Sequence, residues 1–149
     1  MRLCLALLVL ATPASAATGD ERRAVLAVVQ EFFDALAAKD QNRLMATVVP
    51  EGRISVQRLR DGKTQLRTQG WADWANSLAQ AKEKLEERMH NPKVRVSGSI
   101  ASVWTYYTFH RNRAFSHCGI DNFDMAKLDG RWKIVNISYT VQTQGCRRK

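Results

Sequence analysis

The first periodic stretch of the chain has apolar residues at the spacing of a helix. They recur through the sequence RRAVLAVVQEFFDALAAKD, at Val25, Val28, Val29, Phe32 and Leu36. Thr18 and Glu21 precede this run at the spacing of a capping box. Asp40 can cap a second, short helix in QNRLMATVV, which Pro50 and Gly52 are expected to end.

The hydrophobic pattern then changes from helical spacing to the alternation of strands, and later returns to helical spacing. RISVQRLR and KTQLRTQ flank Asp61-Gly62, which predicts a β-hairpin. A third helix is predicted from Gly70 to Asn91-Pro92. Its apolar stripe consists of Trp71, Trp74, Ala75, Leu78, Ala81 and Leu85.

Beyond Pro92 the chain is predicted to consist of strands only. They are KVRVSGS, IASVWTYYTFH, AFSHCGIDNFDMAKL and RWKIVNISYTVQT, separated by turns at Gly98, Asn112 and Asp129-Gly130. Helices followed by an antiparallel meander indicate an α+β domain with its helices packed on one face of the sheet.

The start of the chain has the features of a leader sequence. MRLCLALLVLATPASA combines the basic Arg2, a short apolar run and small residues up to Ala16, which is typical of a signal peptide. The apolar run is too short to span a bilayer. We therefore expect residues 1–16 to be removed and 17–149 to form a single exported domain, periplasmic or secreted, with no transmembrane segment.

The charge and the cysteines bear on two further points, nucleic-acid binding and a disulfide. The net charge of +9 is spread along the chain, and no nucleic-acid motif accompanies it, so we expect no nucleic-acid partner. Two cysteines follow the leader, Cys118 and Cys146. In an oxidising compartment they suggest one disulfide, and the alternative is one buried cysteine and one thiol in the tail.

The segment SHCGIDNFDM places ionisable groups in a strand. If residues 111–114 close a simple hairpin, Asp121 pairs with Trp104, His117 with Thr108 and Phe115 with His110. One sheet face would then carry Trp104, Tyr106, Thr108, His110, His117, Asp121 and Phe123. His117 and Asp121 would lie about 13 Å apart, too far for a direct dyad.

The sequence offers no other chemistry. His90, His110 and His117 lack the helical spacing of metal ligands, so we expect no metal site. No phosphate loop, dinucleotide fingerprint or G-x-S-x-G motif is present, and we expect no cofactor.

The order of elements, with AVVQEFFDALAAKD at the front and CGIDNF and DGRWKIVNISYTV at the back, resembles the nuclear-transport-factor-2-like superfamily. It is most similar to the SnoaL-like and lumazine-binding-like bacterial branches. The resemblance implies a cone-shaped barrel, in which a strongly curved antiparallel sheet wraps around three helices and a pocket. The superfamily includes isomerases, cyclases, dehydratases, ligand binders and protein-binding modules, so the fold alone implies no activity.

The ketosteroid isomerases of that superfamily need a carboxylate base, a tyrosine and a protonated aspartic acid. The resemblance puts Asp121 at the position of the protonated acid. Phe32 stands in place of the tyrosine, and no carboxylate lies near Val56, where the base is expected. Asp121, with His117 as a second candidate, is therefore a catalytic hypothesis that lacks its usual partners.

Three hypotheses for function remain. The first is binding of a small apolar or aromatic molecule with Asp121 as polar anchor, in a pocket lined by Thr108 and the aromatic residues Phe32, Trp71, Trp74, Trp104, Tyr106 and Phe123. The second is a cofactor-free isomerase, cyclase or dehydratase. The third is a protein-interaction module, for which these aromatic residues would only fill the core.

Two expectations concern the sheet itself. The strand IASVWTYYTFH is apolar on both sides, so we predict a homodimer through the outer face centred on Tyr107, Phe109 and Ile120. The register of the last strand stays open. A two-residue turn would place Asn136 and Ser138 on the face of Asp121, and a bulge would present Ile137 and Tyr139 instead.

Overall fold

The computed structural model describes residues 19–60 and 62–147. Three helices and six strands follow one another as α1 Gly19–Ala38, α2 Gln41–Thr47, β1 Val48–Arg60, β2 Lys63–Gly70, α3 Trp71–Ala79, β3 Leu85–Ser97, β4 Ile100–Arg111, β5 Ala114–Leu128 and β6 Arg131–Val141. The leader 1–16 lies outside the described residues, and so does Thr18 of the expected capping box. No helix in the described part of the chain is long and apolar enough to cross a membrane.

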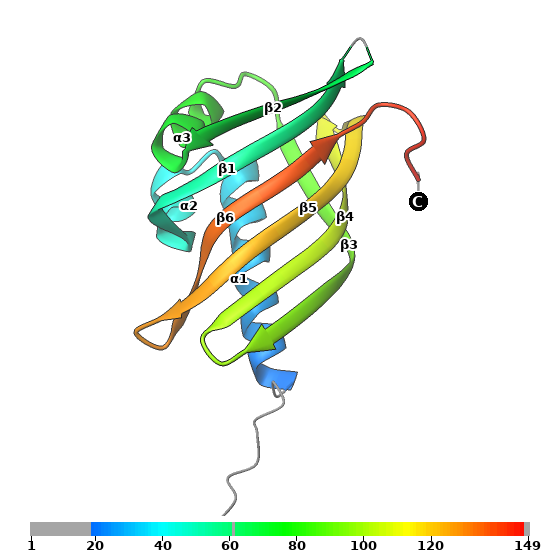
Figure 1. Ribbon diagram of the computed structural model, residues 1–149. Coiled ribbons are helices and arrows are strands. Elements are labelled where there is room, and N and C mark those ends of the chain that lie inside the picture. The colour runs from blue at the N-terminus through cyan, green and yellow to red at the C-terminus, as the bar shows by residue number, and fades with distance from the viewer. Residues whose placement is uncertain (1–18, 61, 148–149) are drawn as a thin grey trace, which may run out of the picture.

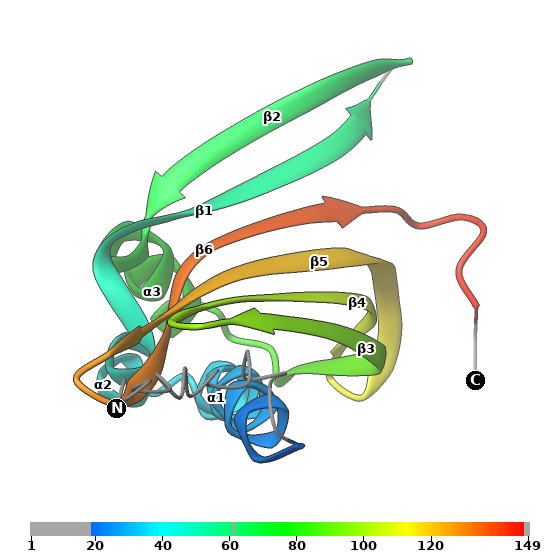
Figure 2. The same cartoon turned by 60° about the horizontal axis from the view of Figure 1, so that its bottom comes forward.

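The six strands form one sheet in the order β2-β1-β6-β5-β4-β3. All neighbours are antiparallel except β1 and β6, which run parallel, so the sheet is mixed rather than a pure meander. The sheet curves strongly, and α1 lies along its concave side with α2 and α3 at one end (Figures 1 and 2). The predicted α+β cone is confirmed.

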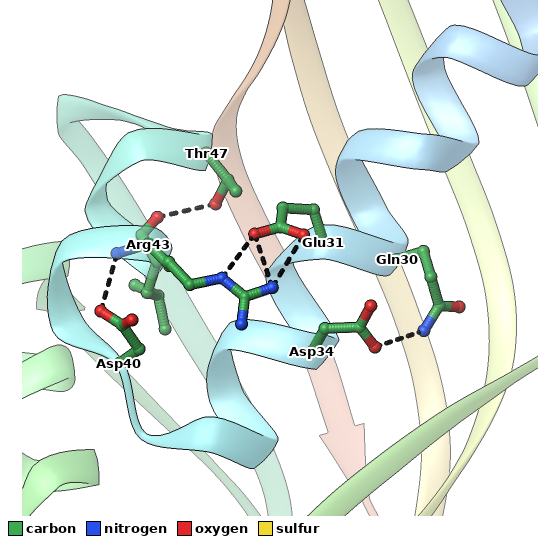
Figure 3. A network of polar contacts seen from close by, with 7 residues as sticks. Gln30, Glu31, Asp34, Asp40, Arg43 and Thr47 are labelled. Carbon is green, nitrogen blue, oxygen red and sulfur yellow. Dashed lines mark hydrogen bonds and ion pairs between the residues drawn. The ribbon is translucent and has the colours of Figure 1, made fainter.

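Helix α1 is held by polar contacts at two places, its first turn and Glu31. Glu21 accepts hydrogen bonds from Lys127 Nζ at 2.7 Å and from Trp132 Nε1 at 2.8 Å, which ties the first turn to β5 and β6. Further along, the Arg43 guanidinium donates to Glu31 and joins α1 to α2 (Figure 3). Asp40 accepts a hydrogen bond from the Arg43 amide at 3.0 Å, and this confirms the predicted helix cap.

The third helix is shorter than predicted. It ends at Ala79, and the segment that was expected to complete it forms the first half of β3. Residues such as Leu85 and Met89 are good helix formers, but here pairing with β4 determines their conformation. Asn91 and Pro92 form a bulge in β3 instead of ending a helix, which an edge strand tolerates.

The last strand combines both of the registers that the sequence left open. Asp129 and Gly130 form the two-residue turn, with φ of 47° and 77°. A bulge at Val135 then shifts the pairing, so that Ile137 lies opposite Phe123 and Tyr139 opposite Asp121. Gly52 allows β1 to approach this bulge, because a Cβ there would come within 1.7 Å of the Val135 carbonyl oxygen. The floor of the interior is therefore apolar and aromatic.

Candidate binding cavity

A cavity of about 270 Å³ lies between α1, α3 and the concave face of the sheet. Its walls come from both helices and from β1, β3, β4, β5 and β6. The aromatic and aliphatic lining consists of Phe32, Phe33, Leu36, Ile54, Trp74, Leu78, Ala81, Leu85, Tyr107, Phe109, Phe123, Ile137 and Tyr139. This volume has room for one small, flat molecule.

The aromatic side of the cavity is formed by rings packed against each other. Phe32 stacks on Trp74 with ring centroids 5.5 Å apart, and it meets Phe123 edge-on at 6.3 Å. Since Phe32 and Phe123 are almost fully buried, these rings hold one another in place with little freedom. The wall is thus preformed.

Two carboxyl groups meet in the wall that the sheet contributes to the cavity. Asp121 on β5 is 2% exposed, and its Oδ2 receives no hydrogen bond from an N–H or hydroxyl donor among the described residues. The carboxyl group of Glu87 on β3 lies beside it, so that either acid, when protonated, can donate a hydrogen bond to the other. Such a bond between two acids requires one proton, because an ionised carboxylate has nothing to donate.

The surroundings favour retention of that proton. Burial raises the pKa of Glu87 to about 8, although the hydrogen bond to Asp121 opposes the shift. Burial also raises the pKa of Asp121 well above its usual range, and the charge of Glu87 adds to this. We infer that the pair holds one proton at neutral pH and can both donate and accept a hydrogen bond.

Tyr107 separates the carboxyl pair from His117. Its ring lies over Gly119, where a Cβ would come within 2.8 Å of Tyr107 Cε1, and its hydroxyl donates to the Thr140 carbonyl at 2.8 Å. His117 stacks on Phe109 at 4.7 Å between centroids. Burial lowers the pKa of His117 to about 4, helped by the positive charges of Arg111 and Arg58. The imidazole is therefore neutral near pH 7 and forms no dyad with Asp121.

Comparison with known proteins agrees with this architecture. Residues 20–140 match the model of the family described as "Putative lumazine-binding". The chain belongs to this family. No curated protein matches it.

Solved structures show the same fold at low identity. A protein of unknown function with a cystatin-like fold from Nostoc punctiforme is 13% identical, with a TM-score of 0.67 over 85% of this chain and 95% of that one. An NTF2-like protein of unknown function from Shewanella baltica is 11% identical, with a TM-score of 0.64 over 87% and 100% of the two chains. An NTF2-like protein with a cystatin-like fold from Novosphingobium aromaticivorans is 13% identical, with a TM-score of 0.67 over 85% and 84%. These likenesses concern the fold alone.

Within the lumazine-binding-like domain, the register predicted for β4 and β5 is wrong over most of its length. Phe115 does pair with His110 as expected, but Ser116 forms a bulge and shifts every later pair by one residue. Asp121 lies opposite Thr105 rather than Trp104, and His117 opposite Phe109 rather than Thr108. The face that carries Asp121 is therefore the face of Tyr107 and Phe109.

The predicted binding residues divide accordingly. Phe32, Trp74 and Phe123 line the cavity together with Asp121 and His117. Trp104, Tyr106 and Thr108 belong to the opposite face of the sheet, where Trp104 is 54% exposed and Thr108 contacts His90 at 2.9 Å. Trp71 is fully buried beside the cavity and donates to the Val135 carbonyl.

The same shift corrects the centre proposed for a dimer. Tyr107 is buried and Phe109 lines the cavity, so neither residue is available on the outer face. Of the three residues, Ile120 alone points outward, in a shallow groove with Trp104 and Tyr106. Cys118, also on that side, forms the disulfide with Cys146, with 5.9 Å between their Cα atoms. The bridged alternative for the cysteines is confirmed.

Glu87 is the site residue that sequence reasoning missed. It fell within the predicted third helix, where nothing connected it to Asp121. Because the segment is a strand paired with β4, Glu87 faces the interior beside Phe109. The signal that could have found it is Pro92 in an edge-strand bulge, which allows the strand to begin seven residues earlier, at Leu85. Among the described residues, no group of three His, Cys, Asp or Glu side chains could hold a metal ion.

Proposed function

We propose that this chain is an exported domain that binds a small, flat, apolar or aromatic molecule, with Asp121 as its polar anchor. The observation that carries the proposal is the cavity itself, whose aromatic walls lead to a buried carboxylate oxygen without a conventional donor. A ligand N–H or O–H group that reached this oxygen would relieve the cost of an unsatisfied buried acceptor. The family description names lumazine, a flat heterocycle with N–H donors, and such chemistry fits this arrangement.

Export rests on the leader within residues 1–16 and on the oxidation state of the cysteines. Disulfides persist in oxidising compartments, so the Cys118–Cys146 bridge supports a periplasmic or secreted location. Expression with and without the leader, followed by cell fractionation, tests this. Recovery of the full-length chain from the cytosol with its leader intact would contradict export.

Ligand binding can be tested by filling the cavity. Lumazine is the probe, and its fluorescence is followed on titration with the purified domain. Wild type should bind one equivalent, and Ala81→Trp, which places an indole in the cavity wall, should lose binding. Asp121→Asn should weaken lumazine binding, and Asp124→Asn is its control, because Asp124 is an exposed carboxylate on the same strand. If neither lumazine nor a molecule co-purified with the domain occupies the cavity, the proposal fails.

A second candidate, a cofactor-free proton-transfer enzyme, is favoured by the Glu87–Asp121 pair. Paired carboxyl groups with raised pKa values can pass a proton to and from a bound carbon acid near neutral pH. Phe32 offers no hydroxyl, so the mechanism would differ from that of the ketosteroid isomerases. With a trial substrate, Glu87→Gln should retain binding and lose turnover. Equal turnover in the variant would exclude this role.

We also propose a homodimer through the outer face of β4 and β5. Trp104 and Ile100 are 54% and 69% exposed there, and Ile120 lies beside Trp104. Burial of such side chains commonly drives association. A Trp104→Glu substitution should then give monomers in sedimentation at micromolar concentration. A wild-type protein that is already monomeric would contradict the proposal.

A further inference from the structure

The rim of the cavity carries two guanidinium groups from different strands. Arg58 on β1 and Arg111 at the end of β4 both line the opening. The positive charges of both lower the pKa of His117, so the three side chains lie near the same part of the rim. His117 itself is flat and stacked on Phe109, which leaves an aromatic surface below the two cations.

The negative charges nearby do not saturate these two cations. Arg111 has Glu83 as a partner at 3.8 Å, but both side chains are about half exposed, and such pairs contribute little. Arg58 has no carboxylate within ion-pair distance among the described residues, and its neighbour on the cavity side is the Tyr139 hydroxyl. Deeper in the cavity, the carboxyl groups of Glu87 and Asp121 lie side by side, and a hydrogen bond between them requires one proton.

The cavity is thus polar at two separate places with an aromatic space between them. We propose that the natural ligand is a flat apolar molecule with a terminal anionic group, which Arg58 and Arg111 bind at the rim while its other end reaches Asp121. This inference rests on the proposed binding function and names the class of ligand. Guanidinium groups bind carboxylate, sulfonate and phosphate groups through charge-assisted hydrogen bonds, so any of the three would fit.

A matched pair of fluorescent probes tests the inference directly. Anilinonaphthalene sulfonate and N-phenylnaphthylamine share one aromatic body, and only the former carries an anion. Wild type should bind the sulfonate about tenfold more tightly or better, the effect expected of one charge-assisted contact at a partly exposed site. Both titrations are carried out at the same ionic strength, and binding at one site per chain is required.

The variant Arg58→Gln/Arg111→Gln should abolish the preference and leave the affinity for the neutral probe unchanged within about twofold. Arg95→Gln/Arg131→Gln is the control, because it removes the same charge from exposed positions away from the rim and should retain the preference. Thermal unfolding of each variant establishes that it is folded.

The imidazole of His117 gives a second readout. Its pKa is lowered by burial and by Arg111 and Arg58, so a bound anion should raise that pKa in NMR titrations, whereas the neutral probe should not. Equal affinity for the two probes, or a preference that survives Arg58→Gln/Arg111→Gln, would overturn the anion inference and leave the proposed function standing. Failure of both probes to bind wild type would instead count against the cavity as a binding site.

Discussion

The two ends of β5 reach the same interior but meet different surroundings. Near Met125 the strand faces a filled core, in which Leu44, Val48, Ile134 and Trp132 are at most 5% exposed. Near His117 it faces a cavity with two carboxyl groups in its wall. Side chains of α1 and α2 fill the core near Met125, whereas α3, whose Trp74 and Leu78 line the cavity, ends after nine residues. A short third helix leaves the space that a ligand could occupy.

The largest difference should appear when a leucine is truncated at each end. Leu44→Ala, in the filled core, should lower the free energy of unfolding by about 2–5 kcal/mol, because the new void cannot collapse. Leu78→Ala borders an existing cavity and should cost at least about 1 kcal/mol less. Urea unfolding of both variants measures this. Equal losses would mean that the cavity is closed in solution.

A smaller effect is expected from the bridge behind the open end. Cys118→Ala/Cys146→Ala removes a crosslink between residues 28 apart and should cost about 3 kcal/mol of unfolding free energy. Hydrogen exchange should speed up most at the Cys118 and Gln142 amides, which bond to each other's carbonyls, and less near Met125. A uniform increase along β5 would contradict a local role, and reduction of wild type serves as the control.

The third effect depends on pH. The folded-state pKa of Glu87 is raised to about 8 from its ordinary 4.5, so the folded state holds more protons than the unfolded state between these values. The free energy of unfolding that this pair contributes must therefore fall as pH rises through that window. Glu87→Gln has no carboxyl group to lose a proton at this position. Its free energy of unfolding should therefore increase relative to that of wild type as pH rises from 5 to 8.

Only the difference between the two proteins is informative here. His117 contributes a slope of opposite sign, because its folded-state pKa is lowered to about 4 and stability is lost as pH falls below 6.5. That slope is common to both proteins and cancels in the difference. A difference between Glu87→Gln and wild type that does not change with pH would contradict a shared proton.

Local signals along the sequence were sufficient to predict most of the fold. Helical periodicity predicts α1, Asp40 predicts the start of α2, and the Asp-Gly turns predict two hairpins. These features depend on residues close together in the chain, whereas compartment and the number of cysteines suggest the Cys118–Cys146 bridge without deciding it.

The candidate site was harder to predict because it depends on registers that one bulge can change. Ser116 moves Asp121 from Trp104 to Thr105, and Val135 decides that Tyr139 rather than Ser138 faces it. Glu87 could be identified as a site residue only after the structure showed that its segment is a strand and not a helix. No local pattern specifies such long-range pairing, so the sequence indicated Asp121 without its partner.

Glu87 and Asp121, as a proton-sharing pair in the wall of an open cavity, are central to the proposed function. Carbon-13 NMR of the side-chain carboxyl carbons, followed from pH 5 to pH 9, tests this pairing most directly. One of the two groups should still be protonated at pH 7, and Glu87→Gln should lower the pKa of Asp121 by removing a neighbouring charge. Two carboxylates that are already fully ionised at pH 6 would contradict the account.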